Sequence, residues 1–349
     1  MPDIEKVREL QSKVMKDIAA GAIIPIMMIG DELGLFEKLY KFGPCSSNKF
    51  AKKTEMDHRY LREWLLALSA AGYVSYESKT EFFSLSDEQY SVLGDENSPS
   101  LMIGGFENLV GAVHNYHLIK QNFKTGKGTE WGSLHPCCLS GSARFFKPAY
   151  SIFLINKWLP SIKGAVSTLN KGGSFADIGC GFGHSTTMIA EQYPQSSVKG
   201  IDPHEQSIHE AQKIAEQKNL NNLSYEIATA ESYSGEYDII SFFDCLHDMG
   251  DPIAAVSYAK TKLKPGGALM IIEPYANDEV SKNFNIIGQM YYAFSTIACV
   301  PASKSQEGGM ALGAQAGLKK LKNVLNNGGF SKIEMTYKTA SNMVIEARV

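Results

Sequence analysis

The chain has 349 residues, of which 44% are hydrophobic and 20% are charged, and its formal net charge is -3. This length suits about two domains, each large enough to bury its own core. A charge so close to neutral creates no strong field that would favour nucleic acid or an anionic membrane, so we expect neither partner.

The six cysteines include no C-x-x-C pair, which favours reduced thiols and a cytoplasmic protein. The apolar stretch 19–30 is too short to span a bilayer and contains Pro25. We therefore predict a buried helix there. His114 and His117 share a helix face, but no cysteine or acidic ligand keeps their spacing, so no metal site is predicted.

The first half of the chain has the pattern of a winged helix. A helix is predicted over 49–53, and a second over 59–71 with Asp57 as its N-cap. Two apolar segments, 73–76 and 82–85, flank a polar stretch and predict a β-hairpin. Helix, turn, helix and hairpin in this order make a winged helix.

The second helix of this motif does not present a basic face. It mixes Asp57 and Glu63 with Arg59 and Arg62, whereas a helix that binds phosphates needs clustered positive charge. We therefore favour dimerisation and construction of a substrate pocket over DNA binding.

The second half alternates short apolar strands with helices, which is typical of an α/β domain with an open parallel sheet. We predict a winged-helix domain over 1–125, a connecting segment and helix over 126–165, and the α/β domain over 166–349. The predicted strands are 174–178, 197–201, 223–227, 237–242, 268–272, 331–337 and 343–347. The last two are expected to form an antiparallel hairpin.

The first of these strands leads into a glycine-rich turn with the spacing G-x-G-x-G, formed by Gly179, Gly181 and Gly183. Dinucleotide sites use G-x-G-x-x-G instead, which disfavours a nicotinamide dehydrogenase. Asp177 precedes the turn, and Asp202 ends the next strand. S-adenosylmethionine carries a cationic sulfonium and a ribose, which suit an acidic turn and a strand-end carboxylate. The pattern predicts an S-adenosylmethionine site.

Further residues at the ends of these strands are candidates for contact with the cofactor. Thr229 occupies the position where methyltransferases often offer an acidic side chain to adenine, so adenine recognition is expected to use the backbone there. The other candidates are Pro203, Ala230 and Phe243.

Four segments identify a narrower resemblance. Residues 60–65, 144–148, 243–252 and 312–317 read YLREWL, RFFKP, FDCLHDMGDP and LGAQAG. They resemble a family of winged-helix methyltransferases found in mycobacteria and some animals, within the class I S-adenosylmethionine-dependent enzymes. This resemblance covers nearly the whole chain. It implies a homodimer and a Rossmann-like seven-stranded sheet of order 3-2-1-4-5-7-6, and it leaves the methyl acceptor open.

His247 is the candidate general base. It resembles the histidine of the H-D-W segment in plant caffeic-acid-type O-methyltransferases, with Met249 in place of the tryptophan. A hydroxyl acceptor must lose a proton, which an imidazole can take near neutral pH. Glu273 follows the strand 268–272 and is expected to orient the ring. Alternatively, His247 caps a helix and Glu273 is a solvated strand end.

The sequence therefore predicts an O-methyltransferase of a small molecule. Asp244 is a further catalytic candidate, because it could face the sulfonium or a cationic acceptor. That position would suit an N-methyltransferase. C-methylation of a small molecule and an S-adenosylmethionine-binding winged-helix regulator are also compatible with the sequence. Tyr291 or Tyr292 is expected in the acceptor pocket.

Overall fold

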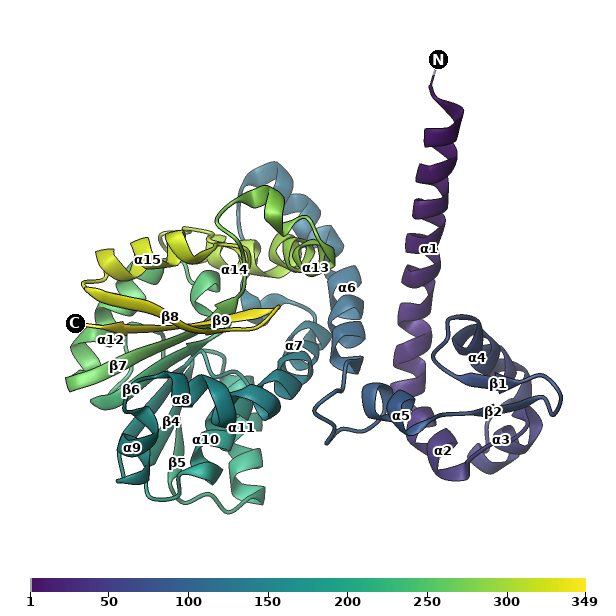
Figure 1. Ribbon diagram of the computed structural model, residues 1–349, viewed down its shortest axis with the longest axis horizontal. Coiled ribbons are helices and arrows are strands. Elements are labelled where there is room, and N and C mark those ends of the chain that lie inside the picture. The colour runs from purple at the N-terminus through teal and green to yellow at the C-terminus, as the bar shows by residue number, and fades with distance from the viewer. Residues whose placement is uncertain (1) are drawn as a thin grey trace. The chain divides into compact units, whose positions relative to one another are not determined.

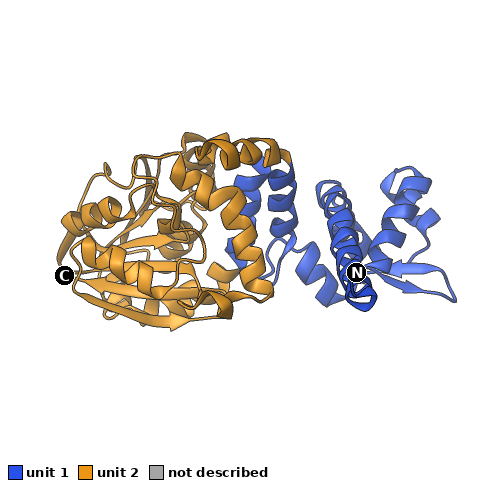
Figure 2. Ribbon diagram, turned by 90° about the horizontal axis from the view of Figure 1, so that it is seen from above, with its two compact units in different colours: residues 1–113, 136–148 blue, residues 114–135, 149–349 orange. Residues whose placement is uncertain are grey.

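The computed structural model describes residues 2–349 and consists of two compact units, coloured separately in Figure 2. Unit 1 contains the chain up to Val113 and the segment Pro136–Pro148, and unit 2 contains His114–His135 and Ala149–Val349. The boundaries fall inside helix α6 (Ile103–Thr125) and at the end of helix α7 (Pro136–Ala149).

The predicted winged helix is present in unit 1. Helices α3 (Ser47–Thr54) and α4 (His58–Ala70) precede strands β1 (Ser75–Glu77) and β2 (Phe82–Ser84), which pair antiparallel. The Asp57 carboxylate accepts hydrogen bonds from the first free backbone N–H groups of α4, and this type of cap contributes about 1 kcal/mol. The predicted apolar face of α4 is buried; it consists of Leu61, Trp64, Leu65 and Leu68.

Helix α1 (Ile4–Glu32) is much longer than the buried helix predicted over 19–30. Met27, Met28 and Gly30 are buried, but 4–22 are exposed, so the prediction holds for the last turns alone. Side chains of α4 cover the C-terminal end of α1, and the N-terminal part of α1 extends beyond them. No single helix among residues 2–349 is long and apolar enough to cross a membrane, although α1 and α2 (Leu35–Phe42), bent by 69°, pass that test as a pair.

Arg144 on α7 fixes this helix within unit 1. Its guanidinium lies 2.8 Å from Asp31 at the end of α1 and 2.7 Å from Glu107 on α6, and it also contacts Glu96. Three carboxylates on one guanidinium explain the raised pKa of Arg144, because they outweigh its burial. Helix α5 (Asp87–Leu93) completes the unit.

Unit 2 is built on a seven-stranded sheet of order β5-β4-β3-β6-β7-β9-β8, which is the predicted order 3-2-1-4-5-7-6. Strands β3 to β7 run parallel, and β9 pairs antiparallel with both β7 and β8, as predicted for the terminal hairpin. The strands are β3 (Ser174–Ile178), β4 (Ser197–Asp202), β5 (Leu223–Ile227), β6 (Tyr237–Phe243), β7 (Leu263–Pro274), β8 (Lys332–Lys338) and β9 (Asn342–Arg348). Strand β7 begins earlier than predicted because Leu263 pairs with Tyr237 across a bulge.

Helices cover both faces of this sheet (Figure 1), so its central strands are buried and mostly apolar. On one face α12 and α15 pack against β6, β7 and β9, and α10 and α11 lie on the other. The α-helices of this unit are α8 (Leu159–Ser161), α9 (Ala165–Asn170), α10 (His184–Gln192), α11 (Glu205–Gln217), α12 (Pro252–Lys262), α13 (Ile286–Phe294), α14 (Val300–Lys304) and α15 (Leu318–Asn327).

Among residues 2–349, two π-helices continue regular helices and three short 3-10 turns lie in connecting segments. The π-helix η2 (Tyr150–Trp158) follows α7, and η5 (Ser295–Cys299) follows α13. The 3-10 turns are η1 (Trp131–Ser133), η3 (Leu246–Asp248) and η4 (Val280–Asn283).

Asp251 caps α12 as the sequence predicts, since its carboxylate accepts the N–H of Ala254 at 2.9 Å.

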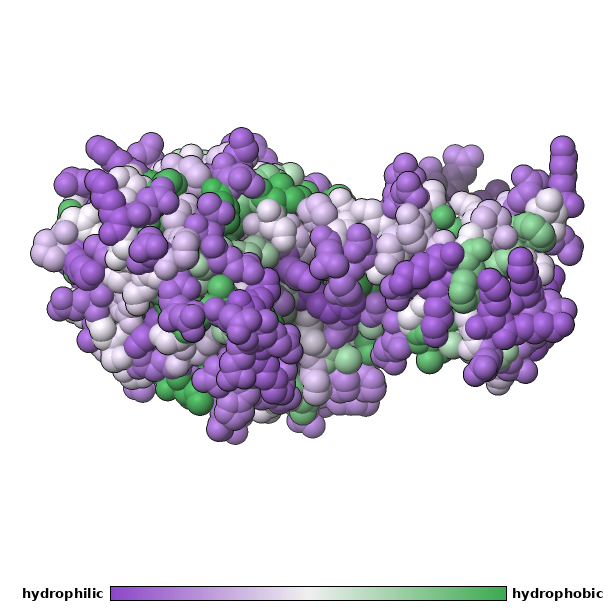
Figure 3. Space-filling view, turned by 90° about the horizontal axis from the view of Figure 1, so that it is seen from below, coloured by the Kyte–Doolittle hydropathy of each residue, from purple (hydrophilic) through white to green (hydrophobic). Residues whose placement is uncertain are grey.

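The surface carries hydrophobic side chains in scattered patches among hydrophilic ones, as the face in Figure 3 shows. Isolated apolar side chains at a surface need no partner. A longer exposed apolar run lies on α1, where Ile4 is 62% exposed and Ile18 is 60% exposed.

Candidate active site

The glycine-rich turn joins β3 to α10, and its three glycines all have positive φ. A Cβ atom on Gly179 would lie 2.7 Å from Sγ of Cys245, and one on Gly183 would lie 2.3 Å from the hydroxyl of Tyr225. A Cβ on Gly181 would meet nothing within 4 Å. Packing therefore demands glycine at the two ends of the turn, while the middle of the turn exposes its backbone to open space.

Asp177 supports this turn from inside the sheet. Its carboxylate is fully buried and accepts hydrogen bonds from the hydroxyls of Ser185 at 2.6 Å, Thr186 at 2.7 Å and Ser241 at 3.4 Å. Burial raises its pKa to about 6, against the effect of these donors. The side chain thus ties the start of α10 to β3 and β6. The three hydroxyls were not predicted, although two of them open the helix directly after the turn.

Asp202 connects the end of β4 to the same turn. One carboxylate oxygen accepts the N–H of Gly181 at 2.9 Å, and the other accepts the N–H of His204 at 2.8 Å. Burial raises the pKa of Asp202, while the two backbone donors oppose this effect. Each oxygen keeps a further lone pair, so the side chain can brace the turn and still accept hydroxyl donors.

The other predicted cofactor residues lie at the carboxyl ends of the parallel strands, where open α/β sheets bind ligands. Phe243 ends β6, is buried, and packs edge-on against Tyr150 with ring centroids 5.7 Å apart. Thr229 is exposed after β5, and its N–H donates to the hydroxyl of Ser232 at 3.0 Å. Ala230 is partly buried, and Pro203 is exposed beside Asp202.

His247 and Glu273 form the predicted pair. Nδ1 of the imidazole lies 2.5 Å from Oε2 of Glu273, and the backbone N–H of His247 donates to Oε1 at 3.3 Å. Both side chains are buried, with 3% and 1% exposure. Glu273 is therefore not a solvated strand end, and the cap of the following helix is Asp251 rather than His247.

A second carboxylate faces the other ring nitrogen. Nε2 of His247 lies 3.2 Å from Oδ1 of Asp248, and the thiol of Cys299 lies beside both groups. Burial alone would lower the pKa of His247. The carboxylates of Asp248 and Glu273 outweigh burial and raise that pKa well above its usual value.

Asp244 lies at the carboxyl end of β6 with a left-handed backbone, at φ 50°. One of its oxygens accepts the side-chain amide of Asn342 on β9 at 2.9 Å, and the other accepts the hydroxyl of Tyr150 at 3.4 Å. Burial, and then the charge of Glu273, raise the pKa of Asp244. Asn342 was not predicted, because no local pattern connects the last strand to this position.

Of the two aromatic candidates for the acceptor pocket, Tyr291 belongs to this cluster. It is buried on α13, and its pKa is raised by burial and by the nearby Asp244. Tyr292 is partly exposed.

Comparison with known proteins agrees with both halves of this architecture. Residues 169–329 match the model of a family described as a methyltransferase domain, and 21–94 match the Rv2258c-like winged HTH domain. The ubiquinone biosynthesis O-methyltransferase of Acinetobacter baylyi is 28% identical over 151 residues. The match spans 42% of this chain and 60% of that relative.

Two solved structures share the fold across almost their full length. PigF with SAH is 16% identical with a TM-score of 0.72, and the alignment covers 97% of this chain and 99% of that one. Human N-acetylserotonin methyltransferase in complex with SAM is 15% identical with a TM-score of 0.71, covering 97% of each chain. Residues 169–329 are therefore similar to a methyltransferase domain, and residues 21–94 are similar to an Rv2258c-like winged HTH domain.

Proposed function

We propose that this protein transfers a methyl group from S-adenosylmethionine to a hydroxyl group of a small molecule. The contact between His247 and Glu273 carries the proposal, because it presents a buried, oriented imidazole at the carboxyl ends of β6 and β7. The glycine-rich turn follows β3, the strand next to β6, and so opens at the same edge of the sheet. The named O-methyltransferase relative supports the same reaction class.

The cofactor is expected on the open side of the glycine-rich turn. Gly181 leaves its backbone accessible, Asp202 offers lone pairs to the ribose hydroxyls, and Phe243 provides an apolar surface. The backbone at Thr229 and Ala230 would contact adenine, and Pro203 would flank the ribose. When bound, S-adenosylmethionine supplies a methyl group on a cationic sulfur. Asp177 acts indirectly, since its carboxylate holds the turn in place through Ser185 and Thr186.

His247 would remove the proton of the acceptor hydroxyl. Because Glu273 accepts the Nδ1–H, Nε2 is the atom that takes up this proton, once the ring, whose pKa is raised, has lost its own. The acceptor oxygen then forms its bond to the methyl carbon. The carboxylates of Glu273 and Asp248 flank the resulting imidazolium and stabilise its charge. General-base catalysis of this kind typically contributes roughly 10²–10⁴ in rate.

A cationic amine acceptor is the second candidate. Asp244, Asp248 and Glu273 place three carboxylates around one imidazole, and no lysine or arginine among residues 2–349 forms an ion pair with them. Burial disfavours the charged forms of Asp244 and Asp248, and a positively charged ligand nearby would stabilise them. Such an amine must lose a proton before it can attack the methyl carbon. An S-adenosylhomocysteine release assay against phenols, amines and carboxylates separates the two candidates, since each predicts turnover with a different acceptor class.

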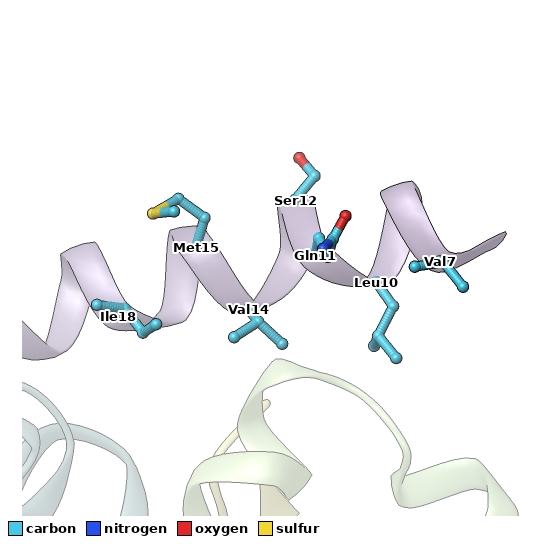
Figure 4. A pocket seen from close by; sticks show the side chains of 7 residues that line it. All are labelled: Val7, Leu10, Gln11, Ser12, Val14, Met15 and Ile18. Atoms are coloured by element: carbon cyan, nitrogen blue, oxygen red, sulfur yellow. The ribbon is translucent and has the colours of Figure 1, made fainter. Parts of the chain in front are cut away.

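We further propose that α1 forms a homodimer contact with a second copy of the chain. Ile4, Val7, Val14 and Ile18 follow the a and d spacing of a heptad, and all four are exposed. Gln11 occupies an a position, where a polar residue specifies register. Figure 4 shows Leu10 and Val14 pointing to one side of the helix and Ser12 and Met15 pointing to the other.

The winged helix would serve this assembly and the acceptor pocket rather than DNA. Arg59 on α4 forms an ion pair with Glu63 and so does not add free positive charge. We assign assembly to residues 1–125 and methyl transfer to 166–349, connected by 126–165. None of the six cysteines forms a disulfide, which suits the reducing cytoplasm.

The glycine-rich turn can be tested with Gly181→Ala and Gly183→Ala. Both force alanine into a left-handed backbone, which costs roughly 1–2 kcal/mol. Gly183→Ala also collides with Tyr225 and should lower the melting temperature further. Gly181→Ala meets no protein atom, so we expect a near-normal fold but at least tenfold weaker binding of S-adenosylhomocysteine by calorimetry. Unchanged affinity would place the cofactor elsewhere.

The general base can be tested with His247→Asn, whose amide can still donate to Glu273. We expect turnover of a hydroxyl acceptor to fall by roughly 10²–10⁴, because the proton acceptor is lost. S-adenosylhomocysteine affinity should stay within about threefold, since the cofactor residues are untouched. Glu273→Gln is the companion variant and should lower turnover less. Wild-type turnover in folded His247→Asn would exclude the base role.

The α1 contact can be tested by analytical ultracentrifugation of Val14→Glu, with Ser12→Glu as the matched control on the opposite side of the helix. A charge at a buried d position should dissociate the dimer, whereas the same charge at residue 12 should leave it intact. A monomeric wild-type protein at tens of micromolar, or equal effects of the two variants, would refute the contact.

A further inference from the structure

Three potential metal ligands converge on one side of His247. A ring nitrogen of His247, a carboxylate oxygen of Asp248 and Sγ of Cys299 all lie within 4.8 Å of one another, and Nε2 is the ring nitrogen that contacts Asp248. The first two come from the turn η3, and the thiol comes from the last residue of the π-helix η5. π-Helical turns recur at functional sites because they displace side chains from the regular helical positions.

The Asp248 carboxylate is incompletely hydrogen-bonded in this cluster. Its Oδ1 atom is buried and has no hydrogen bond of normal geometry among residues 2–349, although the thiol of Cys299 interacts with the carboxylate. A buried acceptor in that state costs about 1–3 kcal/mol. Oδ1 lies 3.2 Å from Nε2 of His247. The carboxylates of Glu273 and Asp248 on either side of the ring favour a positive charge in this gap, either a proton on Nε2 or a metal cation in its place.

The spacing suits a tetrahedral ion of the zinc type. Nitrogen and oxygen ligands bind zinc at about 2.0–2.2 Å, so two such ligands lie roughly 3.3 Å apart at the tetrahedral angle. The observed separation of Nε2 and Oδ1 is 3.2 Å. A thiolate binds at about 2.3 Å, which requires Sγ roughly 3.5 Å from each of the other two atoms. A separation of about 3.5 Å is compatible with three ligand atoms that all lie within 4.8 Å of one another.

The surroundings of the cluster resemble those of metal-binding histidines. Such a histidine usually donates its other ring N–H to a carboxylate, as His247 does to Glu273. The thiol of Cys299 is buried, and an ordinary thiol keeps its proton at neutral pH until an ion binds. Coordination then forms the metal–sulfur bond and releases that proton to solvent.

We propose that His247, Asp248 and Cys299 form a binding site for a thiophilic divalent ion of the zinc class, which inhibits the enzyme. The fourth coordination position would be left to water. An ion on Nε2 removes the lone pair that would accept the proton of the acceptor hydroxyl. The inhibitory effect therefore rests on the proposed general-base role of His247, whereas binding of the ion does not.

Titration of the full chain with Co²⁺ tests the binding directly, because a cobalt–thiolate bond gives an absorption band that oxygen and nitrogen ligands do not produce. We expect one Co²⁺ per chain with this band, displaced by Zn²⁺. Cys299→Ser should abolish the band. Asp248→Asn, which nearly preserves shape, should weaken binding at least tenfold. Cys137→Ser, in unit 1, is the control and should leave the band unchanged.

The outcomes separate the site from the proposed function. Absence of the band in the wild type, or its persistence in folded Cys299→Ser, would overturn the metal site. If Zn²⁺ binds and inhibits methyl transfer, and a chelator restores turnover, both the site and its inhibitory role are supported. If Zn²⁺ binds at Cys299 without changing turnover, the ligand set stands, and the inhibitory role fails together with the assignment of Nε2 as the base.

Discussion

The Glu273 carboxylate fixes the arrangement of the buried polar cluster around His247. It is buried at the end of β7 and accepts both the ring Nδ1–H and the backbone N–H of His247. These two contacts set the tautomer of the ring and hold η3 against the sheet, so Nε2 must face Asp248 and Cys299. Glu273 on the neighbouring strand therefore determines the direction in which Nε2 points, whether its partner is an acceptor hydroxyl or a cation.

The parallel sheet brings these groups together without long loops. Glu273 lies near the end of β7, Asp244 follows β6 and Asp177 lies near the end of β3, and these strands are neighbours. Because parallel strands share one carboxyl edge, each strand delivers an acidic group to the same place. The strain at Asp244, with φ 50°, is offset by hydrogen bonds to Asn342 and Tyr150.

Sequence patterns were sufficient where the determining residues are close in the chain. Apolar runs bounded by Gly, Asp and Pro located the strands, and the spacing of Gly179, Gly181 and Gly183 located the turn. Residues that act through distant contacts were missed. Ser241 meets Asp177 from 64 positions away, and Asn342 meets Asp244 from 98 positions away. Cys299 also carried no local signal, because its neighbours in space come from η3. The exposed half of α1 was not predicted, because a helical sequence pattern does not reveal how much of the surface of the helix is covered by the rest of its unit.

Each of the two π-helices continues an α-helix and carries a residue of the cluster. Tyr150 begins η2, and Cys299 ends η5. A π-helical turn contains an extra residue relative to an α-helical turn, so deleting one residue restores the regular helix and rotates its C-terminal remainder by about 100°. One deletion in η5 would thus remove the thiol from His247 while leaving every strand of the sheet in register. A single-residue insertion or deletion in such a turn therefore changes which side chain faces His247, without any substitution in the sheet or in the glycine-rich turn.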